Sequence, residues 1–470
     1  MTDEALCDLT AVELRRLLGA ADVSAREVLD SHLSRIDRVN HLVNALVTIV
    51  PEIAAERALE ADEKLARGEP LGLLHGLPVA HKDLFNTSGI RTTLGSPIYF
   101  NNVPDKNDLI VERQISEGAV TVGKTNTPEF GAGSQTFNEV FGVTKNPYDL
   151  SKTCGGSSGG AAVALSARML PLCDGSDLGG SLRNPAAFCN VVGFRPSVGR
   201  VPTISSDNLW MPMATSGPMA RTVSDVALYL SAISGPHPLV PSSIMETPDF
   251  FLGSLDRDFS GTRVAWSPDS GGLPMDGAIK KALNIVPNIL SDLGCDVVEI
   301  WPDLSEAREI GQTLRAWVFE LGYEPLLKSH RDQLKETVIW NIELGRKLSL
   351  KDHVDASRKQ ARMFMRLQNF MDDFEYLVSP VTQVLPFDHS TEFITEIDGV
   401  ELETYIDWMR SCTDISTTMH PAISVPAAFS DNGLPVGVQI VGRNRADLSV
   451  LQLAFSFEQA TRVGERAPLF

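Results

Sequence analysis

The sequence predicts an α/β protein built in layers, with parallel strands next to helices. From about Leu74, short β-like runs such as LPVAH and AVTVGK alternate with helical stretches and with turns of Gly, Pro and Asn. This order is the one expected of a parallel sheet. The 470 residues can bury a large core. Because no Pro- or Ser-rich linker divides the chain, we expect one large domain instead of two linked ones.

The N-terminal part, residues 1–70, is predicted to be helical. Thr10 with Glu13, and Ser24 with Glu27, match the capping box, in which the first side chain caps an amide and the Glu reaches back. Apolar residues follow each box at helical spacing. A third helix is predicted from Pro51 onward, in a segment rich in Ala, Glu and Leu. We expect these helices to cover the core.

The later elements continue the alternation of helices and strands. The pattern of strand and helix signals is more variable from about residue 240 to 370, and large apolar residues occur on the helices predicted there. The predicted helices lie at 108–117, 161–168 and 448–461, and the further strand candidates at 264–270, 378–381 and 433–442.

Composition excludes several classes of function. Sixty acidic against 41 basic residues give a net charge of −19, which argues against nucleic acid or an anionic membrane as a partner. No run of about 18 apolar residues predicts a spanning helix. The six cysteines lack metal-ligand spacing, no HExxH pair occurs, and the N-terminus carries no signal peptide. We therefore expect a cytoplasmic protein with reduced thiols and no metal.

Two Gly- and Ser-rich stretches, 155–160 and 174–185, raise the question of a phosphate-binding loop. A Walker loop needs a lysine directly after its glycines, and a dinucleotide fingerprint needs GxGxxG; neither stretch matches. The nucleophile-elbow pattern GxSxG is met by 156–160, which would make Ser158 the nucleophile, but no HGGG-type motif precedes it. Each stretch taken alone predicts no more than a turn.

A lysine changes the interpretation of these stretches. A serine hydroxyl is a weak nucleophile and needs a base, and a lysine can act as that base when burial keeps it neutral. Lys82 follows the apolar run LPVA, so its side chain can enter a buried site. The alternative is an exposed lysine at the end of a strand. Together, Lys82, Ser157 and Ser181 favour nucleophilic catalysis.

At this point the sequence resembles the amidase signature enzymes. The resemblance is strong from about residue 70 to 235 and looser from 375 to 460. Its motifs, in chain order, are GLPVAHKD (76–83), TTLGS (92–96), GKTNTPEF (123–130), NPYD (146–149), GGSSGG (155–160), DLGGSLRNP (177–185), GFRP (193–196), GPMARTVSD (217–225) and GLPVG (433–437).

The resemblance implies a fold and a division of the chain. The fold is a single amidase signature domain with a mixed, mostly parallel central sheet covered by helices on both faces. Its expected parts are N-terminal helices (1–70), a signature core (about 75–235), a variable region around the substrate pocket (about 240–370), and C-terminal core strands with a helix (375–465).

The resemblance also implies a Ser–Ser–Lys triad. Ser181 matches the nucleophile, Ser157 the bridging serine and Lys82 the base, and the peptide bond Gly156–Ser157 is expected to be cis. The backbone amides of residues 178–181 are expected to form the oxyanion hole. The residues concerned are Leu178, Gly179, Gly180 and Ser181 for that hole, and Ser158, Asp177 and Arg183 as supporting residues.

Residues near these motifs receive other expectations. Asp177 and Arg183 are expected to form an internal ion pair, and Ser158 to orient Ser157 or Lys82. Cys154 is expected to be a packed thiol. His81 should point away from Lys82 on a strand and receives no role. Ser176 matches no catalytic position and is expected to be a loop residue.

The implied activity is hydrolysis of a small-molecule amide by water through an acyl-enzyme, without a cofactor. Hydrophobic or aryl amides are the hypothesis for the substrate, with ester or carbamate side activity. A homodimer is the family-based expectation for the assembly. Residues proposed for an apolar pocket are the 201–215 segment, Trp317, Phe319, Trp340 and Trp408; for each of them a place in the core is the alternative.

Two other functions stay open. The A subunit of a glutamyl/aspartyl-tRNA amidotransferase is a glutaminase of the same family, but His420-Pro421 replaces the glycine-containing step of its C-terminal motif. Leu178 and Asn184 also depart from the commoner residues at their positions. A catalytically inactive binding protein is disfavoured because Lys82, Ser157 and Ser181 are all present. A stand-alone hydrolase is therefore preferred.

Overall fold

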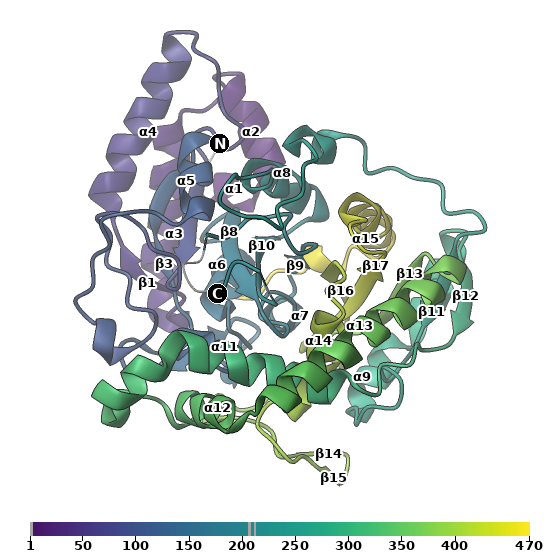
Figure 1. Ribbon diagram of the computed structural model, residues 1–470. Coiled ribbons are helices and arrows are strands. Elements are labelled where there is room, and N and C mark those ends of the chain that lie inside the picture. Colours follow the sequence, from purple (N-terminus) through teal and green to yellow (C-terminus); the bar gives the residue numbers. More distant parts are fainter. Residues whose placement is uncertain (1–2, 205–207, 211–212) are drawn as a thin grey trace.

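A single eleven-stranded sheet forms the centre of the molecule (Figure 1). The computed structural model describes residues 3–204, 208–210 and 213–470. From one edge to the other the strands are β1 (Leu46–Ile49), β3 (Val120–Thr125), β2 (Pro78–Lys82), β8 (Leu172–Asp177), β10 (Thr215–Ala220), β9 (Val192–Arg195), β16 (Ala422–Phe429), β17 (Pro435–Gly442), β13 (Tyr376–Pro380), β11 (Arg263–Trp266) and β12 (Asp296–Glu299).

The sheet is mixed, as predicted, but its parallel pairing is confined to two groups. Strands β3, β2 and β8 are parallel neighbours, and so are β13, β11 and β12. The other neighbouring pairs are antiparallel. Parallel neighbours need a crossover, which α5 provides between β2 and β3, whereas a short turn joins β16 to β17. The expectation of a mostly parallel sheet therefore holds only for these groups.

Helices cover both faces of the sheet, as expected. Neighbouring residues on a strand point to opposite faces. Val441 of β17 packs in a cluster with residues of α11 and α13, whereas Ile440 packs in the cluster that includes α8 and α15. The helices are α1 (Asp3–Asp8), α2 (Ala11–Gly19), α3 (Ala25–Val43), α4 (Pro51–Ala66), α5 (Leu109–Ser116), α6 (Gly159–Ser166), α7 (Arg183–Phe188), α8 (Val223–Ile233), α9 (Gly277–Ala282), α10 (Val286–Asp292), α11 (Ala307–Ser329), α12 (Glu336–Lys347), α13 (Leu350–Asp373), α14 (Arg410–Thr417) and α15 (Asp447–Thr461).

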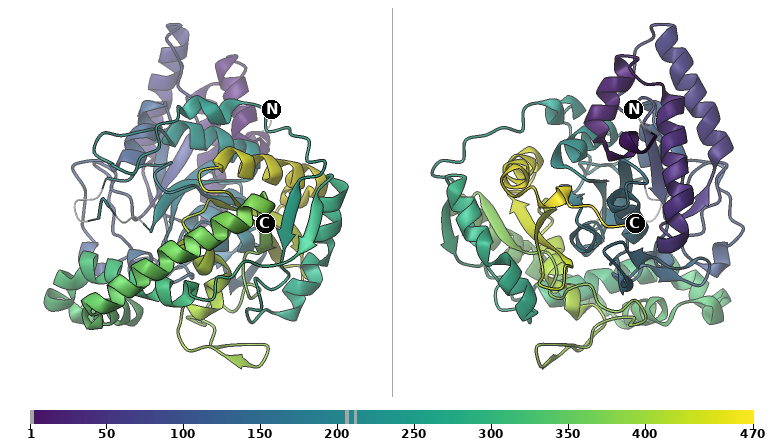
Figure 2. Two further views of the ribbon diagram at one scale, coloured as in Figure 1. Left: turned by 45° about the vertical axis from the view of Figure 1, so that its right-hand side comes forward. Right: turned by 180° about the vertical axis from the view of Figure 1, so that it is seen from behind.

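The N-terminal helices gather at one end of the molecule (Figure 2). Both predicted capping boxes are present. The side chains of Thr10 and Ser24 accept hydrogen bonds from the backbone N–H groups of Glu13 and Glu27. In return, each Glu side chain accepts a hydrogen bond from the backbone N–H of the capping residue. These bonds satisfy amides that a helix start leaves without partners. The prediction of helices at this end is confirmed.

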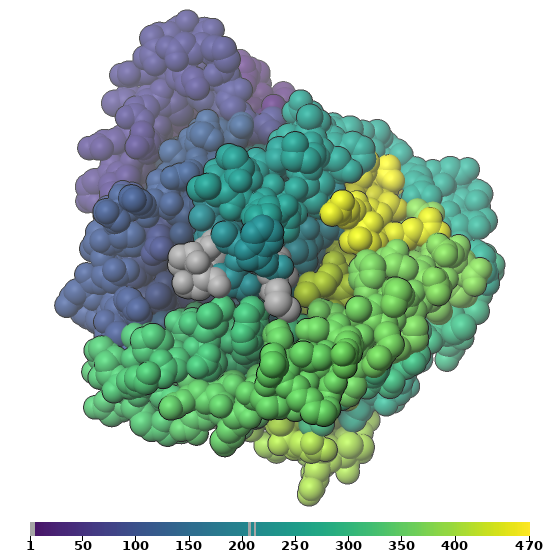
Figure 3. Space-filling view, in the orientation of Figure 1, coloured from purple at the N-terminus to yellow at the C-terminus, as the bar shows by residue number. Residues whose placement is uncertain are grey.

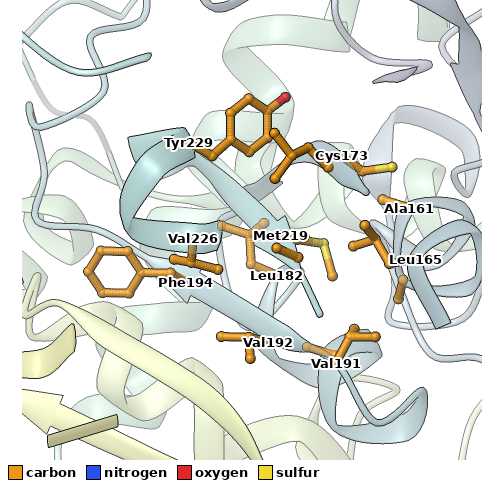
Figure 4. Packing of buried hydrophobic residues seen from close by; sticks show 14 of the residues in the cluster. Ala161, Leu165, Cys173, Leu182, Val191, Val192, Phe194, Met219, Val226 and Tyr229 are labelled. Carbon is orange, nitrogen blue, oxygen red and sulfur yellow. The ribbon is translucent and has the colours of Figure 1, made fainter. Parts of the chain in front are cut away.

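Small residues bring α6 close to the sheet. Every residue of α6 is buried, and Ala161 and Leu165 pack with residues of β8, β9, β10 and α8 (Figure 4).

All six cysteines are free, as expected, and all of them are buried. Burial raises the pKa of the Cys154 thiol to about 12, so this cysteine is a packed thiol. Among the described helices, none has the length and apolar character needed to cross a membrane.

Small two-stranded hairpins complete the secondary structure. Their strands are β4 (Phe137–Asn138) with β5 (Gly142–Val143), β6 (Lys145–Asn146) with β7 (Asp149–Thr153), and β14 (Glu396–Ile397) with β15 (Val400–Glu401).

Candidate active site

Lys82 is the last residue of β2, and its side chain is completely buried. Its Nζ donates to Ser157 Oγ at 2.7 Å and to Ser176 Oγ at 3.0 Å. Burial lowers the pKa of this lysine to about 7, although the nearby carboxylates of Asp177 and Asp174 work in the opposite direction. An amine with such a pKa is neutral in a large share of molecules at neutral pH, so it can accept a proton from a hydroxyl.

Ser157 lies on the loop that leads into α6. The peptide bond Gly156–Ser157 is cis, as the resemblance implied. Ser134 Oγ donates to the carbonyl of Gly156 at 2.7 Å, and Thr136 Oγ1 donates to that of Gly155 at 2.8 Å. Ser157 itself is only 2% exposed. The loop therefore holds the Ser157 hydroxyl in a fixed position against Lys82.

Ser181 lies between the end of β8 and the start of α7, and it is half-buried. The N–H of Ser158 donates to the Ser181 carbonyl at 3.1 Å, which joins the two serine-containing loops. Within the described residues, the hydroxyls of Ser157 and Ser181 form no hydrogen bond with each other. Catalytic hydrogen bonds often tighten only when substrate binds. The structure thus joins the loops of the predicted nucleophile and its bridging serine through their backbones.

A buried ion cluster supports the Ser181 loop. Arg183 donates to Asp177 through Nε and Nη2, both at 3.0 Å, and Arg195 contacts the same carboxylate at 3.3 Å. Burial disfavours the charged carboxylate, but the two guanidinium groups more than offset this and hold the pKa of Asp177 well below its usual range. The expected pair of Asp177 and Arg183 is present, and Arg195 is a third member that the sequence did not single out.

Arg183 also connects the loop to distant parts of the chain. Its Nη1 donates to Gln439 Oε1 at 2.5 Å, and its Nη2 donates to Ser416 Oγ at 2.6 Å. Gln439 belongs to β17 and Ser416 to α14. A buried guanidinium with this many acceptors fixes the loop between the sheet and a helix.

The amides predicted for the oxyanion hole divide into two groups. The N–H of Gly180 donates to Asp177 Oδ1 at 2.7 Å, so it is already engaged. The N–H groups of Leu178, Gly179 and Ser181 donate to no acceptor in the described part of the chain. Gly180 has φ +118°, and a Cβ on it would lie 2.6 Å from that of Cys412. Only glycine fits at this position, so Gly180 allows the backbone of the loop to adopt this conformation.

Two expectations about neighbouring serines need correction. Ser176, expected to be a loop residue, belongs to β8 and receives a hydrogen bond from Lys82. Ser158, expected to orient Ser157 or Lys82, instead contacts the backbone of Ser176 at 3.4 Å through its hydroxyl. The reason is the position of β8, which continues to Asp177 and places Ser176 beside both residues.

Similarity to known proteins identifies the family of this chain. A family model described as Amidase matches residues 27–451. The chain belongs to the amidase signature family. An acylamidase of Rhodococcus erythropolis is 34% identical over 475 residues, which cover 100% of this chain and 98% of that protein. Membership of the family supports amidase activity.

Two further relatives of this chain differ in what their names describe. The A subunit of the glutamyl-tRNA(Gln) amidotransferase of Alkaliphilus metalliredigens is 32% identical over 487 residues, with 98% of each chain covered. A bacterial aryl acylamidase of the amidase signature family has a TM-score of 0.91 at 28% identity, and the match covers 98% of this chain and 99% of that one. The fold and the family are therefore shared with both hydrolases and amidotransferase subunits.

The protein has an apolar cavity of about 400 Å³ near the loop of residues 178–181. None of Lys82, Ser157 and Ser181 lines it, but Leu178 packs against the same apolar cluster as three of its lining residues. In Figure 3 the green surface of residues 307–373 lies next to the teal surface of residues 213–250, and the cavity has lining residues from both. Its lining residues are Val198, Trp210, Met213, Ser242, Leu314, Trp317, Val318, Gln360, Phe364, Met419, Asn444 and Arg445.

The aromatic residues proposed for the pocket have different places. Trp317 lines the cavity, whereas Phe319 and Trp408 are buried in the core. Trp340 lies at another hollow, with its ring edge-on to that of Tyr405. In the 201–215 segment Trp210 and Met213 line the cavity, and residues 205–207 and 211–212 lie outside the described residues. No cluster of three or more potential metal ligands occurs among the described residues.

Proposed function

We propose that this protein hydrolyses the C–N bond of carboxylic amides through an acyl-enzyme on Ser181. The observation that carries the proposal is the buried contact between Lys82 Nζ and Ser157 Oγ at 2.7 Å. A buried lysine that faces a serine hydroxyl, and has a pKa of about 7, has the position and the proton affinity of a general base.

The first half of the reaction moves a proton from Ser181 to Lys82 and forms one bond. Neutral Lys82 takes the proton of Ser157, and Ser157 takes that of Ser181, whose Oγ attacks the amide carbonyl carbon. The resulting oxyanion is stabilised by the amides of Leu178, Gly179 and Ser181, which have no other acceptor among the described residues. Donors directed at a developing charge typically contribute about 3–4 kcal/mol each to transition-state stabilisation.

The second half breaks the C–N bond and releases the acyl group. Protonated Lys82 returns its proton through Ser157 to the leaving nitrogen, because an unprotonated amide anion is a very poor leaving group. Water then attacks the ester carbonyl carbon, and one of its protons passes through Ser157 to neutral Lys82. The same proton returns through Ser157 to Ser181 Oγ as the C–O bond breaks and the carboxylic acid leaves. The residues of this chain account for every proton in the cycle.

The substrate class proposed is hydrophobic or aryl amides, anilides included, with ester or carbamate side activity. The cavity beside Leu178 supports this class, because tryptophan, methionine and phenylalanine side chains form much of its wall. The names of the acylamidase and aryl acylamidase relatives support it as well.

A second candidate is the glutaminase component of a tRNA-dependent amidotransferase. Relatives with that name cover the chain as fully as the acylamidase does. The C-terminal motif argues against it, since His420 is buried, with its ring 5.4 Å from that of Phe364 and its Nε2 2.7 Å from the Gln368 amide. Phe364 lines the cavity, and the imidazole of His420 packs behind it against its ring.

Intact-mass spectrometry after exposure to an amide panel tests the proposal. The panel contains an anilide, an aliphatic amide, glutamine, an ester and a carbamate, and Ser181→Ala is the control. We expect an acyl adduct on the wild-type protein with the anilide, and none on Ser181→Ala. Adducts on Ser181→Ala would refute the assignment of the nucleophile, and turnover of glutamine alone would establish the second candidate.

A pair of tryptophan variants tests the cavity. Trp317→Ala is expected to raise KM for the anilide about tenfold, because it removes apolar wall from the cavity. Trp340→Ala is the matched control, since this tryptophan lies at another hollow, and its KM should stay that of the wild type. Equal effects of the two variants would refute the cavity as the substrate pocket.

A further inference from the structure

A carboxylate that has no role in the reaction described so far holds the main chain of Lys82. Asp174 lies on β8 beside β2 and is completely buried. Its Oδ1 accepts the backbone N–H of Lys82 at 2.7 Å. The carboxylate therefore fixes the end of β2, the point from which the lysine side chain extends toward Ser157.

The second oxygen of Asp174 has two side-chain partners. His81 Nδ1 lies 2.7 Å from Oδ2, and Gln114 Nε2 donates to the same oxygen at 2.9 Å. His81 Nε2 lies 3.0 Å from Thr121 Oγ1, and the Tyr229 hydroxyl donates to the Gln114 carbonyl oxygen. This network joins four elements of the fold, β2, β3, α5 and α8, to one buried carboxylate.

The network differs from the cluster around Asp177 in its charges. Two guanidinium groups neutralise Asp177. Asp174 has no arginine or lysine side chain among its hydrogen-bond partners in the described residues, and only neutral donors and the imidazole of His81 satisfy it. Its charge is therefore available to act on Lys82 through a dry interior, where Coulomb interactions are strong.

We propose that Asp174 is a positioning residue for the base: it anchors the backbone of Lys82, its charge sets how strongly that lysine binds a proton, and His81 holds it in place. This proposal rests on the proposed function of Lys82. Without a nearby carboxylate, burial alone would leave the lysine a weaker base, which accepts a proton less readily from Ser157.

The charged and titratable groups around this pair come from several elements. Asp174 and Asp177 both favour the charged form of Lys82. Around Asp174 itself lie His81 of β2, Lys124 of β3, Asp108 before α5 and Tyr229 of α8. The carboxylates of Asp174 and Asp177 are thus the anionic groups whose removal is expected to change the base.

Asp174→Asn tests the proposal with little change of shape. The His81 imidazole can change its tautomer and accept a hydrogen bond from the new amide. The readout is the pH dependence of labelling by a fluorophosphonate, which reacts with an activated serine and needs no natural substrate. We expect the acid limb of the rate to move to lower pH by about 1 unit and the plateau to fall.

Two further variants complete the test. Asp225→Asn removes another buried carboxylate, which accepts the N–H of Val12 at 2.9 Å and is not among the groups that act on Lys82, and its acid limb should stay in place. His81→Leu removes the imidazole that contacts Asp174 at 2.7 Å, so the carboxylate loses one of the contacts that hold it beside Lys82. The acid limb of His81→Leu should move in the same direction as that of Asp174→Asn, by less.

The outcomes separate this proposal from the proposed function. An acid limb that stays in place in both Asp174→Asn and His81→Leu, with only a lower rate or thermal stability, means a structural role and overturns the proposal. An equal shift in Asp225→Asn overturns it too. If the wild-type protein is not labelled at all while Ser181 is intact, the proposed function fails, and the role of Asp174 fails with it.

Discussion

Lys82 and Lys124 are two buried lysines on neighbouring strands that differ in what their amines contact. Lys82 ends β2 and Lys124 lies on β3, and both side chains are completely buried. Burial lowers the pKa of both amines, to about 7 for Lys82 and about 8 for Lys124. Measured by burial and proton affinity alone, either lysine could act as a base.

The contacts of the two amines distinguish them. Lys124 Nζ donates to the carbonyl of Phe85 and to Thr87 Oγ1. A carbonyl has no proton to give, so this amine is held as a donor that joins β3 to the 85–87 loop. Lys82 contacts the hydroxyls of Ser157 and Ser176 instead. Burial favours the neutral amine of both lysines. In the proposed reaction only Lys82 contacts the serine hydroxyl from which it takes a proton.

The largest effect is expected when each lysine becomes methionine. Lys82→Met removes the base, and the rate of amide hydrolysis should fall by about 10³-fold. Lys124→Met should keep kcat within about tenfold but lower Tm, because it leaves the Phe85 carbonyl without its donor. Initial rates and thermal denaturation of the two variants measure both effects, and equal losses of rate would remove the distinction between the lysines.

The pH profile tests which proton affinity controls the rate. In the proposed mechanism neutral Lys82 is the active form, and burial lowers its pKa to about 7. Activity should therefore be lost as pH falls through that value and rise toward mildly alkaline pH. Below the pKa, kcat/KM should fall about tenfold per pH unit. A profile with an acid optimum would contradict the assignment of this base.

A smaller effect is expected from the second hydroxyl that Lys82 contacts. Ser176→Ala removes one of the two hydrogen bonds of the amine and leaves that to Ser157. The rate should fall about fivefold, a loss of roughly 1 kcal/mol in transition-state stabilisation. Steady-state kinetics with the anilide measure it, and a loss as large as that of Lys82→Met would give Ser176 an essential role.

The smallest effect is expected for the hydroxyl partner of Lys124. Thr87 is buried, and Thr87→Val removes the hydroxyl at 2.7 Å from Nζ. The free energy of unfolding should fall by about 1–2 kcal/mol, while kcat stays that of the wild type. Urea denaturation together with initial rates checks this, and a loss of activity would connect Lys124 to the reaction.

The sequence predicts the contact between Lys82 and Ser157 better than the surroundings of that contact. Lys82 and Ser157 lie in motifs that match those of the amidase signature enzymes, and the resemblance implies their contact. The sequence misses Ser176 because Asp, Gly and Ser are poor strand formers, so DGSD has the pattern of a loop although β8 continues through it. It misses the pair of His81 and Asp174 because the two residues meet only when β2 and β8 pair.

The arrangement of the sheet is also only partly predictable from the sequence. Strand and helix types follow from local patterns, which explains why the capping boxes and most core strands lie where expected. Whether two strands run parallel depends on which strands become neighbours, and local patterns do not contain this information. Likewise, the partners of Arg183 on β17 and α14 are more than 200 residues away in sequence.

One edge of the eleven-stranded sheet carries charges that oppose aggregation. An edge strand offers unpaired N–H and C=O groups to any strand of another molecule. Strand β12 forms one edge, and its first and last residues, Asp296 and Glu299, are both exposed carboxylates. A second copy approaching this edge would bring like charges together, on a chain that already carries −19. The acidic ends of β12 thus oppose the pairing of this edge with the same edge of another molecule.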